Sequence, residues 1–245
     1  AVKHPEVNVI SDFRDPWTWG TGYGYPMMSN KRKLAEQKIE KETIYRSSYV
    51  TCPTQKMKDD IVERYPEYAD KIKLLQHFLD MDDIEMKSIP KSNNDAFTKV
   101  IFGGTLYSGV ESFLEEFLSF IENHNKNKQK KFFCEFYILN KLEDKTLLKY
   151  VGKYVIFNDS ISSKEFLKKV SSSDFYLALY PDYFKDVLST KFMELLHLTN
   201  NIIYIGEKGA ISDFIEKNEI GVRINPNNIF KSLGVEMIKE KREEI

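Results

Sequence analysis

Polar residues that could bind a nucleotide follow the apolar run that ends near residue 181. Ser189 and Thr190 stand where a helix is expected to begin, directly before Lys191, and Glu194 comes about one turn later. Free backbone N–H groups and the positive end of the helix dipole attract a phosphate, and a lysine adds a full positive charge. A glutamate one turn further on can accept hydrogen bonds from ribose hydroxyls. The same residues would also serve as a helix cap followed by a surface ion pair between Lys191 and Glu194.

A pair of glycines ends the apolar run KVIFGG. Gly103 and Gly104 are followed by Thr105, shortly before a segment with helical spacing. Glycines in this position let a backbone approach a ligand closely, although they serve equally in a tight turn that binds nothing. The spacing is neither the G-x-G-x-x-G of dinucleotide-binding enzymes nor that of a P-loop, so both classes lose support.

A third set of polar and aromatic residues follows the run NVISDF near the N-terminus. Asp12, Arg14 and Asp15 lie at the end of this run, and Trp17 begins a loop rich in Trp, Tyr and Gly. Charged groups at a strand end can orient a polar substrate, and aromatic rings offer flat faces to a sugar. The alternative is structural: Arg14 pairs with an aspartate to hold the loop, and the aromatic rings pack beneath it.

Metal ligands and catalytic nucleophiles are not indicated. The four histidines are scattered without the spacing of a zinc site, and no serine occupies a G-x-S-x-G elbow. Cys52 and Cys134 stand in apolar runs, where buried free thiols are expected, and this use of cysteine favours a reduced, cytoplasmic setting. We therefore expect no metal and no cofactor, and no residue spacing identifies a catalytic group.

Alternating strand-like and helix-like runs predict how these residues are positioned. From residue 97 to the C-terminus, six short apolar runs alternate with amphipathic helical patterns, which predicts a doubly wound, Rossmann-like parallel sheet. Residues 1–80 repeat this rhythm with only three strand-like runs, which predicts an incomplete second α/β lobe. The polar segment 81–96 contains Pro90 and shows no period, so it is the predicted linker between the lobe and the domain at 97–245.

The balance of charge argues against a nucleic-acid-binding protein. Lys and Arg number 36 against 37 Asp and Glu, for a formal net charge of -1. Such a chain has no global field that would attract polyanions. No run approaches the roughly 18 to 20 apolar residues that cross a bilayer, which leaves a peripheral membrane association open.

Four segments resemble the group 1, family 4-like glycosyltransferases of the GT-B fold, and they occur in the family's order. DFRDPW at 12–17 resembles an element near the end of the family's N-terminal domain, and YVTCPTQKMKDDIVERYP resembles the strand and helix that follow. FGGTLY resembles the opening strand of the donor-binding domain. STKFMELLHLTNNIIYIGEKGAISDFIEKNEIG resembles the family's most distinctive stretch, in which a helix carrying a Lys and a Glu precedes a strand, a turn of small residues and a second helix. The resemblance covers nearly the whole chain.

The resemblance implies a retaining transfer of sugar from a nucleotide-diphosphate sugar to a glycan or lipid-linked acceptor, in bacterial polysaccharide or glycolipid synthesis. It assigns Glu194 to the donor ribose, and Asp186, at the first acidic position of the family's pattern, to the sugar or the pyrophosphate. The rest of the implied donor site is Gly103, Gly104, Thr105, Ser189, Thr190 and Lys191. The implied location is the cytoplasm, with a place at the inner face of the membrane left open.

The sequence also departs from the family. Many members hold the pyrophosphate with an Arg and a Lys after the first glycine loop, where this chain has Thr105 and Val110. The family's N-terminal domain has further strands before DFRDPW, so we expect a truncated chain that lacks the catalytic part of that domain. Two alternatives remain open: a sugar-nucleotide epimerase of the same fold, and a non-catalytic α/β protein that binds free sugar through the aromatic loop 17–25.

Overall fold

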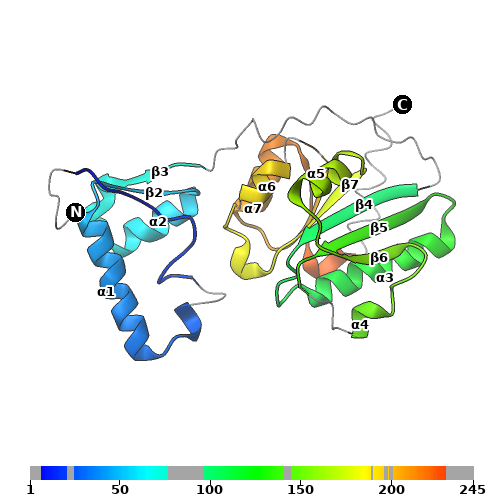
Figure 1. The fold of residues 1–245 in the computed structure, drawn as a ribbon, viewed down its shortest axis with the longest axis horizontal. Coiled ribbons are helices and arrows are strands. Elements are labelled where there is room, and N and C mark those ends of the chain that lie inside the picture. The colour runs from blue at the N-terminus through cyan, green and yellow to red at the C-terminus, as the bar shows by residue number, and fades with distance from the viewer. Residues whose placement is uncertain are drawn as a thin grey trace. The chain divides into compact units, whose positions relative to one another are not determined.

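The chain folds into two compact units, each built from a parallel sheet and helices (Figure 1). The computed structural model describes residues 7–20, 25–76, 97–140, 145–188, 190–195, 198 and 201–229. The smaller unit comprises Ala1–Leu79 with Asp186–Thr190, and the larger one comprises Asp80–Lys185 with Lys191–Ile245. The predicted linker 81–96 lies outside the described residues.

The larger unit contains an all-parallel, six-stranded sheet in the order β6-β5-β4-β7-β8-β9. Its strands are β4 (Phe97–Gly104), β5 (Lys131–Ile138), β6 (Val155–Asp159), β7 (Phe175–Leu179), β8 (Ile202–Ile205) and β9 (Gly221–Ile224). Numbered from β4, the order reads 3-2-1-4-5-6, which is that of a doubly wound Rossmann-type sheet. The predicted α/β fold class is confirmed, and the six strands coincide with the six apolar runs to within a few residues.

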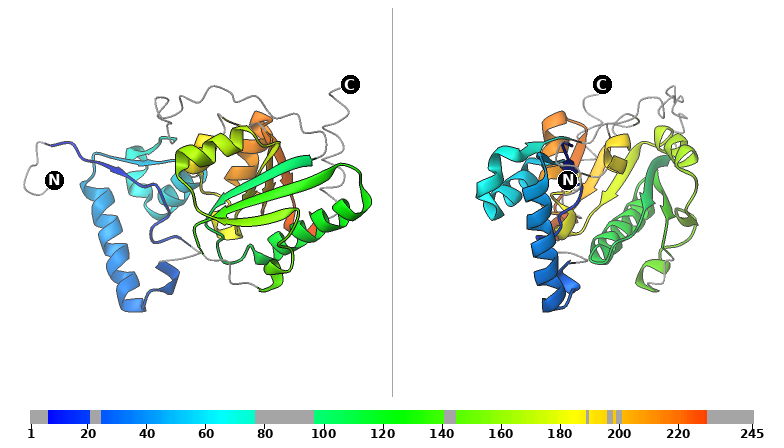
Figure 2. Two further views of the ribbon diagram at one scale, coloured as in Figure 1. Left: turned by 45° about the vertical axis from the view of Figure 1, so that its right-hand side comes forward. Right: turned by 60° about the vertical axis from the view of Figure 1, so that its left-hand side comes forward.

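Helices cover both faces of this sheet (Figures 1 and 2). One face carries α3 (Glu111–Asn127) and α4 (Lys145–Leu148), and the other carries α5 (Ser163–Ser171), α6 (Thr190–Leu195) and α7 (Ala210–Asn218). Side chains alternate along β4: Val100 and Phe102 pack in the core with α3. Gly103 instead faces Phe166 of α5. The interior strands are therefore buried on both sides, as continuous apolar runs indicate.

The long helix α3 supplies the apolar stripe that its sequence predicts. Four side chains at helical spacing are fully buried in the core: Leu114, Phe117, Leu118 and Ile121. Near the end of the helix, the side-chain amide of Asn125 donates to the carbonyl oxygen of Phe132 (2.9 Å) and accepts from its N–H (2.7 Å). These two bonds satisfy the backbone of β5 where the strand begins, so they fix α3 against the sheet.

The smaller unit has three parallel strands in the order β1-β2-β3. Its elements are β1 (Ile10–Asp12), the 3-10 turn η1 (Tyr25–Met27), α1 (Asn30–Arg46), β2 (Tyr49–Cys52), α2 (Gln55–Arg64), the 3-10 segment η2 (Pro66–Lys71) and β3 (Ile72–Leu74). Its core joins Ile44 of α1, Val50 of β2 and Ile61 of α2. Tyr49, the first residue of β2, lies outside this core and is 49% exposed.

Both cysteines are buried free thiols, as predicted: Cys52 lies in β2 and Cys134 in β5. Two further 3-10 turns, η4 (Asp182–Phe184) and η5 (Pro226–Asn228), follow β7 and β9. Within the described part of the chain, no helix has the length and apolar character that a bilayer crossing requires.

The close packing at Gly103 gives a first test. A Cβ at this position would lie 2.2 Å from the nearest ring atom of Phe166. Gly103→Ala is therefore expected to lower the free energy of unfolding of the larger unit by about 1 to 3 kcal/mol, measured in urea by far-UV circular dichroism. Gly152→Ala is the control, because no atom lies within 4 Å of its added Cβ. Equal effects of the two substitutions would show that Phe166 does not restrict this position.

Candidate functional site

The strand order of the larger unit places its candidate site at the boundary between β4 and β7. These two strands are parallel neighbours, paired at Val100 with Phe175 and at Ile101 with Tyr176. The connection after β4 leads to α3 on one face of the sheet, and the connection after β7 leads to α6 on the other (Figure 1). In open α/β sheets, the crevice outside the carboxyl ends of two such strands is where ligands bind. Residues 105–110 and 180–185 lie at this crevice.

The loop after β4 is held in place by the neighbouring loop after β5. The side-chain oxygen of Asn140 accepts from the N–H of Leu106 (2.9 Å), and its amide donates to the Leu106 carbonyl (3.2 Å). The N–H of Leu139 donates to the carbonyl of Gly104 (3.0 Å). Gly104 itself has a φ of 136°, a backbone conformation that favours glycine. The loop therefore leaves the strand with a fixed backbone.

The loops after β4 and β7 contact each other directly. The rings of Tyr107 and Phe184 lie 4.7 Å apart at an angle of 56°. The hydroxyl of Tyr183 donates to the carbonyl of Ser108 (3.1 Å). Burial raises the pKa of Tyr183 above its ordinary value. The two loops thus meet through aromatic rings, and Tyr107 remains 37% exposed.

The start of α3 does not offer an open phosphate site. Val110 caps the helix without a side-chain hydrogen bond. The carboxylate of Glu111 accepts from the N–H of Gly109 (2.6 Å), so a negative group already occupies that donor. Residues 104–110 include no Lys or Arg, and Lys185 pairs with Asp182 at 2.7 Å. A diphosphate at this crevice would therefore need positive charge from the helix that follows β7.

That helix, α6, begins at Thr190, where the sequence predicts it. Ser189 lies outside the described residues, and for Thr190 and Lys191 the description stops at the backbone. Glu194 is partly buried, and Asp186 is partly buried in the segment that groups with the smaller unit. The assignment of these residues to a donor site thus stays a prediction, as does their alternative role in a helix cap.

The two glycines of the predicted donor loop have different surroundings. The missing side chain at Gly103 makes room for the Phe166 ring, so this glycine is needed for packing. Gly104 and Thr105 are partly buried and begin the loop at the crevice. A role of Gly104 and Thr105 at a ligand stays a prediction.

In the smaller unit, the charged residues after β1 form a local pair. Arg14 Nε donates to Asp12 at 3.0 Å, and both side chains are largely exposed. The other oxygen of Asp12 accepts from the hydroxyl of Thr51 on β2 (2.7 Å), while Asp15 is exposed. The ion pair that the structural alternative predicts is therefore present, and it ties the loop to the neighbouring strand.

The tryptophans of this loop pack on Phe13 and are held by α1. Trp17 meets Phe13 edge to face with centroids 5.8 Å apart, and Trp19 stacks on it at 6.2 Å. The indole N–H of Trp17 donates to buried Glu36 (2.9 Å). Trp17 is thus fixed by packing and by one charge-assisted bond, which limits the ring surface left for a substrate.

A second buried glutamate on α1 holds the middle of the loop. Glu40 is fully buried and accepts from the N–H of Thr18 (2.9 Å), from the Thr18 hydroxyl (2.6 Å) and from the Tyr65 hydroxyl (2.6 Å). Arg64 donates to the Thr18 hydroxyl (2.8 Å) and lies 3.9 Å from the Glu40 carboxylate. Every oxygen of this buried charge therefore has a partner, as a stable buried carboxylate requires.

Sequence reasoning did not single out Glu36 and Glu40, although a signal was present. Both stand four residues apart in line with Ile44, so all three share one face of α1. An apolar residue on that face indicates that the face points inward. The contact between Tyr107 and Phe184 had no comparable signal, because 77 positions separate the two residues in the sequence.

The strand order and parallel register define a doubly wound α/β chain of the Rossmann type. No family model matches the chain, and no curated protein matches it. One similar solved chain comes from the crystal structure of accessory secretory proteins 1, 2 and 3 in Streptococcus pneumoniae, at 13% identity and a TM-score of 0.43. The match covers 82% of this chain and 44% of that one, so this chain spans less than half of its length. A likeness at this level identifies neither a family nor a function.

Metal coordination has no candidate among the residues that the structure describes, since no three His, Cys, Asp or Glu side chains gather there.

Removal of the buried carboxylate should destabilise the smaller unit. Glu40→Ala leaves three donors without their acceptor, and we expect the free energy of unfolding to fall by about 3 kcal/mol. The chain has two tryptophans, Trp17 and Trp19, both in this unit, so urea unfolding followed by tryptophan fluorescence reports it alone. Glu42→Ala, which removes an exposed partner of Arg46, should change stability by no more than about 0.5 kcal/mol. A Glu40→Ala effect as small as that of the control would contradict this account.

Alkaline pH should also weaken the smaller unit. Burial raises the pKa of Cys52 to about 11, and burial with the bond to Glu40 raises the pKa of Tyr65 to about 12. At alkaline pH the folded state therefore keeps protons on Cys52 and Tyr65 that the unfolded chain loses. The stability that these two groups contribute is complete below about pH 9, and it decreases as the pH rises toward their pKa values in the folded state. The urea midpoint by tryptophan fluorescence should decrease over this range, and less steeply in Cys52→Ala. Cys134→Ala, in the larger unit, should leave the slope unchanged, and an equal change in both variants would refute the assignment.

Proposed function

We propose that this chain is the nucleotide-sugar-binding part of a glycosyltransferase that moves a sugar to a glycan or lipid-linked acceptor. The observation that carries the proposal is the 3-2-1-4-5-6 strand order, because it puts the loop at Gly104 and the STKFME segment after the carboxyl ends of two neighbouring strands. The resemblance of that segment to group 1 glycosyltransferases adds the retaining outcome and a role in bacterial polysaccharide or glycolipid synthesis. The proposed setting is cytoplasmic, with the membrane's inner face as one site of action.

The donor would be held mainly through its charges and its ribose. In this proposal Glu194 accepts hydrogen bonds from the ribose hydroxyls, and Lys191 with the backbone near Thr190 faces the diphosphate. The departing diphosphate accumulates negative charge, so a lysine aimed at it stabilises the transition state more than the ground state. The rings of Tyr107 and Phe184 offer flat faces at the same crevice to a base or a sugar.

The acceptor would be handled by the smaller unit. Asp12, Arg14 and Asp15 are exposed polar groups at a strand end, and Trp17 lies beside them. We assign them to orientation of the acceptor, which is supported by their exposed position after β1 and by the pair that Arg14 forms with Asp12.

A second candidate function has its own support. The carboxylate of Glu111 occupies the N–H of Gly109, and residues 104–110 carry no cation. Both features disfavour a diphosphate at the start of α3, and they favour a non-catalytic protein that binds an uncharged sugar at the same crevice. An epimerase of the same fold would share the donor pocket, and analysis of the products would distinguish it from a transferase.

Thermal unfolding with nucleotides tests the proposal. We expect one of UDP, GDP or ADP, or the corresponding sugar nucleotides, to raise the midpoint, because a ligand at about 100 times its Kd stabilises the folded state by about 2.7 kcal/mol. Glu194→Ala should abolish the shift by removal of the ribose acceptor. Glu216→Ala is the matched control, since this exposed glutamate on α7 is outside the crevice residues.

The outcomes separate the two candidates. A shift with free sugars and none with nucleotides would favour the non-catalytic protein and reject the donor site. A nucleotide shift that Glu194→Ala leaves intact would show that the ribose assignment is wrong. In an active enzyme, Lys191→Ala should lower kcat, whereas unchanged turnover would remove Lys191 from the mechanism.

A further inference from the structure

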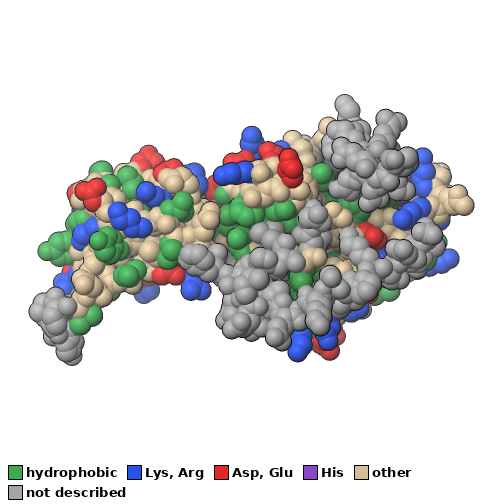
Figure 3. Space-filling view, turned by 90° about the horizontal axis from the view of Figure 1, so that it is seen from above, with side chains coloured by type: hydrophobic (Ala, Val, Ile, Leu, Met, Phe, Trp, Pro, Cys, Tyr) green, Lys and Arg blue, Asp and Glu red, His purple; other side chains and the backbone are tan. Residues whose placement is uncertain are grey.

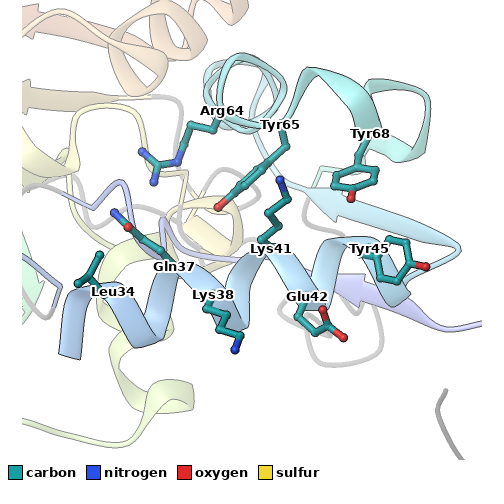
Figure 4. Close-up of a pocket in the computed structure, with 9 residues that line it drawn as sticks. All are labelled: Leu34, Gln37, Lys38, Lys41, Glu42, Tyr45, Arg64, Tyr65 and Tyr68. Atoms are coloured by element: carbon teal, nitrogen blue, oxygen red, sulfur yellow. The ribbon is translucent and has the colours of Figure 1, made fainter. Parts of the chain in front are cut away.

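The smaller unit has an open groove that the proposed donor site does not use. It lies between α1 on one side and α2 with η2 on the other, and has a volume of about 690 Å³ (Figure 4). Its charged and aromatic lining residues are Lys38, Lys41, Glu42, Tyr45, Arg64, Tyr65 and Tyr68. Lys41 points into the groove between the rings of Tyr65 and Tyr68 (Figure 4). This volume is within the range of sites that hold a small organic ligand.

One end of the groove is a fixed aromatic surface. The rings of Tyr45 and Tyr68 lie 6.3 Å apart. The ammonium of Lys71 lies 6.0 Å from the first ring and 5.5 Å from the second, and it donates to the carbonyls of Tyr45 (2.9 Å) and Ser47 (3.0 Å). Because the cation is anchored on backbone, the rings keep their positions, and Tyr45 remains 59% exposed. The exposed ring of Tyr45 and the partly buried ring of Tyr68 offer flat surface of the kind that suits the apolar face of a sugar.

The other half of the groove is positively charged, because α1 directs most of its acids inward. The helix carries six cations: Lys31, Arg32, Lys33, Lys38, Lys41 and Arg46. Two of its three glutamates, Glu36 and Glu40, are buried and bonded to the aromatic loop. The third, Glu42, lines the groove and pairs with Arg46, and Arg32 pairs with Glu36. With six cations against three glutamates, the helix keeps a net positive charge. Figure 3 shows hydrophobic, basic and acidic side chains interspersed on one face of this unit, at the left of the view.

The ammonium group of Lys41 in the groove forms only a weak ion pair within the protein. Lys41 pairs with Glu67 at 3.0 Å, and both side chains are about half exposed. An exposed pair of this kind contributes little, so a carboxylate on a ligand could replace Glu67. Arg64 supplies a second cation whose position is fixed by its bond to Thr18.

We propose that this groove binds an acidic oligosaccharide, with sugar rings on Tyr45 and Tyr68 and a carboxylate at Lys41 and Arg64. The inference rests on the proposed function, since it names the class of acceptor glycan that the smaller unit would hold. A neutral glycan would leave the cations unused, and an acidic peptide would leave the paired rings unused.

Calorimetric titration of the whole chain with oligogalacturonate at low salt tests the proposal. We expect binding of this acidic oligosaccharide, with much weaker binding of a neutral maltooligosaccharide and of polyglutamate. Lys41→Ala and Tyr45→Ala should each weaken binding about fivefold. Glu67→Gln should strengthen it, because the competing carboxylate is gone. The matched controls Lys31→Ala and Tyr49→Ala remove an exposed cation of the same helix and an exposed tyrosine outside the groove, and should leave affinity unchanged.

Equal binding of polyglutamate, or equal loss in the control variants, would overturn the proposal in favour of non-specific charge attraction. Absence of oligogalacturonate binding would overturn it as well. The nucleotide titration is independent of these residues. Binding of oligogalacturonate by a chain that no nucleotide stabilises would support the groove while the donor assignment failed, and the opposite result would reject the groove alone.

Discussion

Parallel pairing of the strands is the constraint on which the rest of this structure depends. Parallel neighbours cannot be joined by a tight turn, so every strand is followed by a crossover and all carboxyl ends meet at one edge of the sheet. In the larger unit the crossovers change face between β4 and β7. Two loops that are distant in sequence are thereby brought together, and Tyr107 contacts Phe184 at that point. The candidate site follows from this topology before any side chain is considered.

Electrostatics then limits what the crevice can bind. The carboxylate of Glu111 has taken the N–H that a phosphate would need at the start of α3. Residues 104–110 include no Lys or Arg, so a diphosphate there would need positive charge from another part of the chain. This charge requirement distinguishes a site for a nucleotide diphosphate from a site for an uncharged sugar. It also makes α6 the most informative place for substitutions.

The smaller unit depends on two carboxylates that most folds would replace by apolar groups. Glu36 and Glu40 hold the loop that contains Trp17 and Thr18, at the cost of desolvating two charges. Because both acids point inward, the outer face of α1 is left basic beside the tyrosine pair. Stability and the chemistry of the groove are thus linked through one helix, and a single residue such as Glu40 bears on both.

The sequence by itself determined the fold class. The continuous apolar runs and the apolar stripe of α3 indicate which faces of the strands and helices are buried, because buried positions recur with the period of the element. It also located the polar residues that begin α6. Only the tertiary structure decided that Gly103 makes room for Phe166, that Glu40 is buried, and that Tyr107 meets Phe184. These features depend on contacts between residues far apart in the chain, whereas sequence periodicity reports only local geometry and the side on which an element is buried.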